Sequence, residues 1–118
     1  MMLYRTLVTY CSLFLRNIDK DGIRVFLESS PQYPNLLSVI QTLKYAGMDV
    51  DAGQCDCEYL TNLSSPFLLH IRKGNKETLL IARWDQKHAS LFVYNMKGKG
   101  WERKEREDIV PLWDGVVI

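Results

Sequence analysis

The hydrophobic pattern of this chain changes its period once, and that change limits the folds it can adopt. Between residues 2 and 17 apolar side chains recur at steps of three and four, which predicts an amphipathic helix. A second helix is expected over residues 22–27 with Asp21 as its N-cap. A third is expected over residues 34–46, opened by a first-turn proline and stopped at Gly47.

Beyond this third helix the period shifts toward two, which predicts strands. A short helical turn is expected at residues 57–60, and a hairpin turn at residues 73–76, where Gly and Asn tolerate a positive φ. The expected strands lie at residues 48–52, 66–71, 78–84, 90–95, from 101 onward, and 116–118. Helices followed by a meandering sheet predict an α+β domain.

Length, charge and cysteine content limit the class of protein. The 118 residues fit one domain, and 47% hydrophobic residues suffice for its core. A net charge of +1 favours neither nucleic acid nor a membrane surface as partner, and no apolar stretch is long enough to span a membrane. Three cysteines make a poor disulfide framework. The apolar end at residues 115–118 fits either a last core strand or a fragment of a longer membrane protein.

Three segments, taken in order, resemble the C39 peptidases, the papain-like cysteine peptidases that process bacteriocins. They are the turn into a helix at Tyr33–Ser38, the strand at Pro66–His70 and the closing strand at Trp113–Val117. C39-like domains are fused to ABC exporters, and others precede membrane redox domains of the vitamin K epoxide reductase type. The resemblance implies a papain-like C39 fold over residues 1–118, with N-terminal helices packed on a twisted antiparallel sheet.

The chain departs from this family at the catalytic positions. Where the family has its histidine, the strand start reads Gly-Asn-Lys-Glu-Thr, with Lys76 and Glu77 at its centre. The orienting Asp is at best Asn95, and the resemblance places His70 at a position that the family uses for packing. A cysteine nucleophile needs a base and a group that orients it. The sequence therefore predicts a degenerate peptidase domain that does not cleave.

A domain of this kind would bind a peptide or leader segment, or an adjoining membrane-transport or redox domain. The predicted binding residues are Tyr33, Asn35, Ser38, Asn75 and Asn95. The resemblance implies a location at the cytoplasmic face of the bacterial inner membrane as part of a larger protein, or in the cytoplasm. Neither nucleic acid nor a cofactor is expected as a partner.

Two alternatives use the cysteines. Cys11 could be the nucleophile of an active peptidase that cleaves a double-glycine leader, although its apolar helical setting favours a buried structural residue. Cys55 and Cys57 form a Cys-x-Cys motif that could act as a thiol-redox accessory. A structural zinc site needs about four ligands, so no metal is predicted.

Overall fold

The computed structural model describes residues 3–118, and the chain divides into two compact units, residues 1–51 and 52–118. The first unit is helical, and the second contains the sheet. The α+β class predicted from the sequence is confirmed, with N-terminal helices followed by an antiparallel sheet. A single domain over residues 1–118 stays a prediction.

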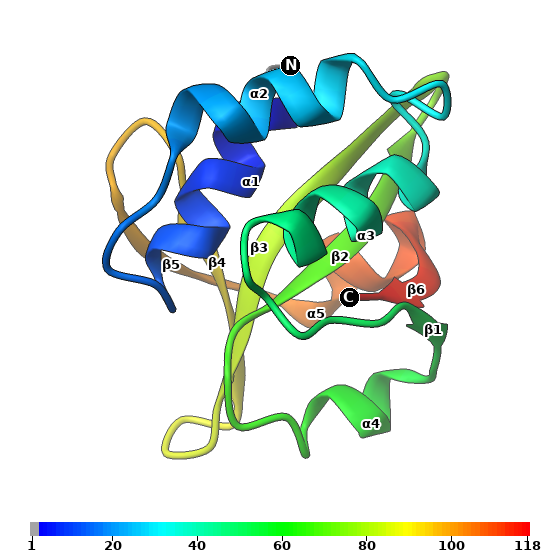
Figure 1. Ribbon diagram of the computed structural model, residues 1–118. Helices are drawn as coiled ribbons and strands as arrows, with labels where there is room; N and C mark the ends of the chain where they lie inside the picture. Colours follow the sequence, from blue (N-terminus) through cyan, green and yellow to red (C-terminus); the bar gives the residue numbers. More distant parts are fainter. Residues whose placement is uncertain (1–2) are drawn as a thin grey trace. The chain divides into compact units, whose positions relative to one another are not determined.

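Three helices make up the first unit: α1 (Leu3–Ser12), α2 (Lys20–Glu28) and α3 (Leu36–Tyr45) (Figure 1). The first is shorter than predicted. Ser12 donates its hydroxyl hydrogen to the carbonyl of Thr9 at 2.6 Å, and a side chain that bonds to the backbone in this way competes with helix continuation. The chain leaves α1 through a turn whose apolar Leu13 and Phe14 stay exposed.

The cap of α2 is Asp19, and the prediction of Asp21 was wrong. The Asp19 carboxylate accepts a hydrogen bond from the backbone N–H of Gly22 at 2.9 Å, whereas Asp21 lies in the first helical turn. A Cβ at Gly22 would stand 2.3 Å from that carboxylate. The glycine therefore leaves the space that the capping side chain occupies.

The start of α3 differs from the prediction, because Pro34 precedes the N-cap and does not lie in the first helical turn. Asn35 is the N-cap, and its side chain accepts from the N–H of Ser38 at 3.4 Å. At the other end Gly47 has φ +103°, and the N–H of Met48 bonds to the carbonyl of Leu43. This is a Schellman motif, which a glycine at that position favours. The predicted stop at Gly47 is confirmed.

The second unit has one six-stranded sheet in the order β1-β6-β2-β3-β4-β5, with every neighbouring pair antiparallel. Two short helices, α4 (Cys57–Leu60) and α5 (Arg106–Ile109), and a 3-10 turn at Val110–Leu112 accompany it. The strands are β1 (Gly53–Gln54), β2 (Phe67–Lys73), β3 (Lys76–Asp85), β4 (Ser90–Asn95), β5 (Gly100–Lys104) and β6 (Trp113–Val117).

The strand predicted at residues 48–52 was wrong. That segment has no strand structure, and β1 begins only at Gly53, where it pairs with Val117 of β6. Met48 and Val50 are half-buried while Asp49 is exposed, so the alternation in the sequence does report burial. This segment has no neighbouring strand to hydrogen-bond with, so its alternating burial does not make it a β-strand.

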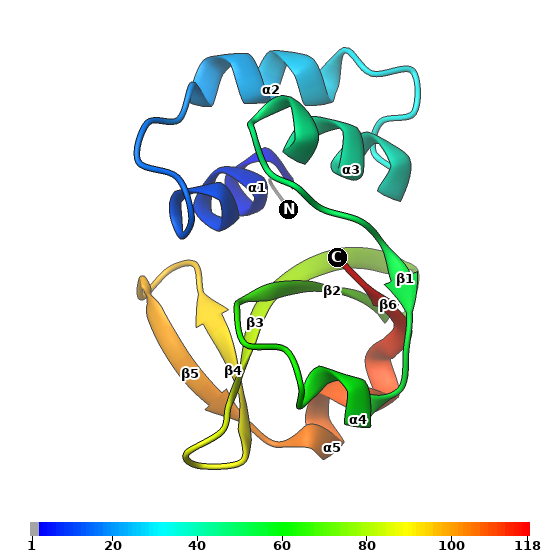
Figure 2. The same cartoon turned by 60° about the horizontal axis from the view of Figure 1, so that its bottom comes forward.

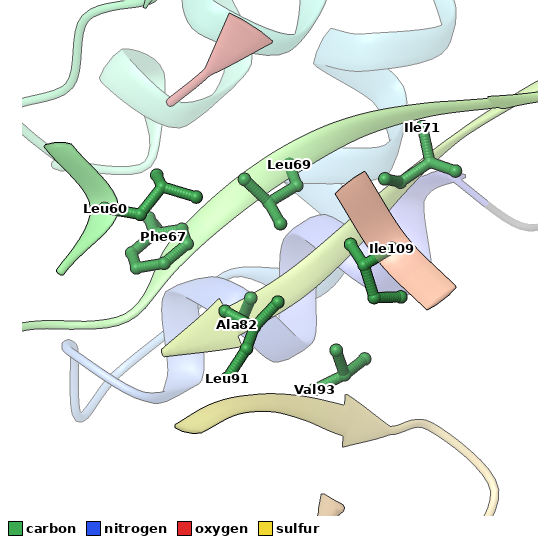
Figure 3. Packing of buried hydrophobic residues seen from close by; sticks show 8 residues of the cluster. All are labelled: Leu60, Phe67, Leu69, Ile71, Ala82, Leu91, Val93 and Ile109. Carbon is green, nitrogen blue, oxygen red and sulfur yellow. The ribbon is translucent and has the colours of Figure 1, made fainter. Parts of the chain in front are cut away.

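One face of the sheet carries the hydrophobic core of this unit. Figure 2 shows α4 and α5 on the same side of the sheet, and Figure 3 shows the cluster that they help to form. Leu60 of α4 and Ile109 of α5 close over strand residues of β2, β3 and β4. The buried members are Leu60, Phe67, Leu69, Ile71, Ala82, Leu91, Val93 and Ile109.

Candidate functional site

A histidine lies on the sheet face opposite this core. Leu69 and Ile71 belong to the core cluster, and side chains alternate along a strand, so His70 points to the other face. It is 8% exposed, and its cross-strand partner is Leu79 of β3. A polar side chain that is nearly buried needs hydrogen-bond partners, and His70 has them.

The first partner is Asp114 of β6, which lies at the start of an irregularity in that strand. Leu69 pairs with Val117, and Ile71 pairs with Trp113. Between these two pairs β6 has twice as many residue steps as β2. The pairing of Ile71 with Trp113 places Asp114 opposite His70, and the bulge takes up the residues that follow. Asp114 Oδ2 lies 2.6 Å from His70 Nδ1, and its Oδ1 accepts from the N–H of Val116 at 3.1 Å.

A glycine and a tryptophan shape this bulge. Gly115 has φ +89°, a left-handed conformation that is strained for other residues. Its carbonyl accepts a hydrogen bond from the N–H of Cys55. The indole N–H of Trp113 donates to the carbonyl of Val116 at 2.8 Å. These contacts close the bulge upon itself and fix the direction of the Asp114 carboxylate.

Glu77 of β3 is the second partner of His70. Its Oε2 lies 3.6 Å from His70 Nε2, and its other carboxylate oxygen accepts from the guanidinium of Arg72, the residue opposite it on β2. The hydrogen bond from Arg72 lowers the pKa of Glu77. Burial raises the pKa of Asp114, but the hydrogen bonds from His70 and from the Val116 N–H outweigh it, so this pKa is lowered too. Both ring nitrogens of His70 thus face carboxylates that ionise readily.

An imidazole oriented by a carboxylate is the base half of a nucleophilic site, but the cysteines of this unit lie on the other face. Cys55 packs against the core cluster, and Cys57 lines a small cavity with Leu60 and Trp84 on the same side. Both thiols are free. Burial, Asp56 and Cys57 raise the pKa of the Cys55 thiol. Neither thiol can therefore be paired with His70.

Cys11, the candidate nucleophile of the first unit, is 0% exposed on α1. Burial raises the pKa of its thiol, and burial together with Cys11 raises the pKa of the adjacent Tyr10 to about 12. A reactive cysteine is partly exposed and has a lowered pKa, so this setting is the reverse of what a nucleophile requires.

The predicted binding residues of the first unit fall into two kinds. Asn35 and Ser38 are engaged with the start of α3, since Ser38 is buried and donates to the carbonyl of Asn35 at 2.6 Å. Tyr33 is 42% exposed in the preceding turn, and nearby Leu37 is exposed as well. Asn35 is exposed too, but its side-chain nitrogen and oxygen both make local hydrogen bonds.

Asn75 and Asn95 are at turns of the sheet, and the structure does not bring them together. Pairing between β3 and β4 begins at Ala82 and Val93, so the start of β3 extends well past the end of β4. At about 3.3 Å per residue the two turns are separated by roughly 15 Å along the strands. Asn95 accepts from two N–H groups of its own turn and donates to Glu102, so its side chain is engaged. Asn75 is exposed.

Sequence reasoning missed the contact between His70 and Asp114. It placed His70 at a packing position, and the structure gives that buried ring two polar neighbours in addition. The available signal was an Asp-Gly pair inside the last strand, because such a pair often marks a bulge. His88 lies in the turn between β3 and β4, and its Nδ1 lies 2.6 Å from Asp85 Oδ2.

Among residues 3–118, no group of three or more His, Cys, Asp or Glu side chains is placed to hold a metal ion. No helix in the same range has the length and apolar character that a membrane span requires.

Neither the protein-family models nor the curated proteins compared with this sequence match it. A solved structure does match: the peptidase domain of Streptococcus ComA, a bi-functional ABC transporter involved in a quorum-sensing pathway. The TM-score is 0.78 with 17% identity, over 98% of this chain and 87% of that one. The predicted C39 peptidase-like fold is therefore confirmed, and at this identity the likeness extends to the fold alone.

Proposed function

We propose that this C39 peptidase-like domain does not cleave peptides and instead binds a peptide segment. The observation that carries the proposal is the separation of thiols from imidazole in the sheet unit: Cys55 and Cys57 lie on the core face and His70 on the other. A cysteine peptidase requires the two groups within hydrogen-bond reach. Cys11 offers no substitute, because burial raises its pKa.

The positions that the resemblance assigns to catalysis support the same proposal. Glu77, near the expected base, is bound to Arg72 and cannot replace a histidine. Asn95, near the expected orienting Asp, is engaged in its own turn and holds Glu102. These side chains have structural partners where an enzyme would present functional groups to its substrate.

The domain has the fold of a peptidase but its sheet unit does not bring a thiol and an imidazole together, so we assign it peptide binding in place of cleavage. A fold does not by itself imply an activity, so this step is an analogy to domains that recognise exported peptides. Exposed Tyr33 and Leu37 in the first unit, and Asn75 in the second, are available to a partner. The partner would be a leader-like peptide or a segment of an adjoining membrane-transport or redox domain.

The test separates cleavage from binding. The protein is incubated with peptides that carry a double-glycine site, and products are followed by mass spectrometry while ¹H–¹⁵N spectra of the same samples report binding. We expect intact peptide and shifted amide resonances. Cleavage that Cys11→Ala abolishes would establish the active-peptidase alternative, and spectra that no peptide perturbs would overturn the binding role.

A further inference from the structure

Aromatic and arginine side chains form two rows across β3, β4 and β5. Arg83 pairs with Phe92, and Phe92 pairs with Arg103, so the aromatic ring stands between two arginines on one face. In the next row Tyr94 pairs with Trp101, and their rings meet edge to face at 5.4 Å between centroids. Leu91 and Val93 point to the opposite face, into the core. We call Arg83, Phe92, Tyr94, Trp101 and Arg103 the arginine–aromatic face.

Arg83 is held in place by rings and not by a carboxylate. Its guanidinium carbon lies 4.7 Å from the centroid of Phe92 and 5.0 Å from that of Trp101. Within residues 3–118 it has no hydrogen-bond or salt-bridge partner. Arg83 also lowers the pKa of Asp85, but the largest cause of that shift is the hydrogen bond with His88, which occupies the carboxylate. A half-buried guanidinium that is already oriented and has its N–H edge free is suited to an anion.

Arg103 is exposed on β5, and it too lacks an ion pair among the described residues. β5 is the last strand of the sheet order, so within residues 3–118 it pairs only with β4. Two further cations, Lys97 and Lys99, lie in the turn that leads into β5. Glu102 at the centre of β5 pairs with Lys104 at 3.7 Å, so Arg103 is the cation of β5 that the described residues leave without an ion pair.

We propose that the arginine–aromatic face and the outer edge of β5 bind an extended acidic peptide, whose carboxylates meet Arg83 and Arg103. This inference rests on the proposed peptide-binding function and names the chemistry of the peptide. Strand addition to an open edge supplies main-chain hydrogen bonds, and the side chains beside the edge supply selectivity. The carboxylate of Glu or Asp accepts two parallel bonds from a guanidinium.

The geometry favours a peptide over single-stranded nucleic acid. Nucleic-acid platforms present open aromatic faces on which bases stack. Here Arg83 lies over one face of Phe92 and one face of Trp101. The rings of Tyr94 and Trp101 pack edge to face. Charged residues on an edge strand normally discourage pairing with further strands. Lys104 is paired with Glu102, but Arg103 would repel a basic strand and attract an acidic one, so the charge on the edge also selects the partner.

The experiment measures fluorescence anisotropy of a labelled peptide in which Glu alternates with Thr. Matched probes replace Glu with Gln or with Lys, and oligothymidylate is the nucleic-acid probe. We expect the Glu peptide to bind, with an affinity that falls as salt rises. Arg103→Gln and Arg83→Gln should each weaken binding about tenfold, as for loss of a charge-assisted hydrogen bond. Lys73→Gln, which removes an exposed cation at the far hairpin, should leave the affinity within about twofold.

Arg83→Lys keeps the charge and tests the guanidinium fork if Arg83→Gln unfolds; it too should weaken binding. Strand addition should also shift the amide resonances of residues 100–104. Equal affinity for the Glu and Gln peptides, or tighter binding of oligothymidylate, would overturn this inference. So would peptide binding that is insensitive to Arg103→Gln and shifts resonances only around Tyr33, although the proposed function would then survive. If no peptide of any composition perturbs the spectrum, the proposed function itself fails.

Discussion

His70 and Asp114 are 44 positions apart in the sequence, and their side chains meet at 2.6 Å between Nδ1 and Oδ2. The register that pairs Ile71 with Trp113 brings Asp114 opposite His70, and the extra residues of β6 bulge out before Val117 pairs with Leu69. Asp114 also accepts the N–H of Val116 within the bulge. One carboxylate thus joins β6 to β2 and closes the turn of its own strand.

Replacing Asp114 should alter stability in a pH-dependent way. The folded-state pKa of Asp114 is below its usual value, about 3.9 in an unfolded chain. Its contribution is therefore present above that value and is lost as pH falls through the folded pKa. Asp114→Asn should cost about 1 kcal/mol or less at neutral pH, since the side chain is 38% exposed and screened by water. Urea unfolding at neutral and acid pH measures both quantities.

The matched control for this prediction is Asp49→Asn, an exposed carboxylate for which residues 3–118 provide no ion pair. The control should track the wild type from neutral to acid pH. The Asp114→Asn protein should lose less stability than the wild type over the same acid range. Parallel curves for all three proteins would show that the contact with His70 does not contribute to folding.

Gly115→Ala should disrupt the bulge directly. The φ of +89° is unfavourable for alanine, and the new Cβ would stand 3.4 Å from the carbonyl oxygen of Cys55. We expect a loss of about 1–3 kcal/mol in the free energy of unfolding. Gly53→Ala is the control, because a Cβ there meets nothing within 4 Å. An unchanged ¹H–¹⁵N spectrum around Asp114 and Val116 in Gly115→Ala would contradict the expected disruption of the bulge.

Gly22→Ala tests the helix start in the first unit. The added methyl would displace the carboxylate of Asp19, which stands 2.3 Å from its position, and so would remove the cap of α2. Loss of such a cap costs about 1 kcal/mol. Asp19→Ala removes the same hydrogen bond, so the double variant should be little less stable than either single one. Additive losses in thermal unfolding would mean that glycine and cap act independently.

The sequence predicts the elements of this fold much better than the contacts of its site. Gly47 marks the end of α3 because glycine readily adopts the left-handed conformation needed there, whereas the N-cap Asn35 was missed because Pro34 suggested an earlier start. Asp19 was missed as a cap because Asp21 fits the same rule two residues later. The contact between His70 and Asp114 depends on the register that pairs β2 with β6, two strands far apart in the sequence. No local pattern specifies that register.

Thiol labelling separates the two alternative activities, a peptidase that uses Cys11 and a redox accessory that uses Cys55 and Cys57. Cys11 is 0% exposed and Cys55 and Cys57 are partly buried, and burial raises the pKa of both Cys11 and Cys55. Because only the thiolate reacts, iodoacetamide should modify the native protein slowly at neutral pH, with Cys57 or Cys55 first and Cys11 only on unfolding. Peptide mapping after timed labelling assigns each site. Rapid labelling of Cys11 would favour the peptidase, and reversible protection of Cys55 and Cys57 together by a glutathione buffer would favour the redox accessory.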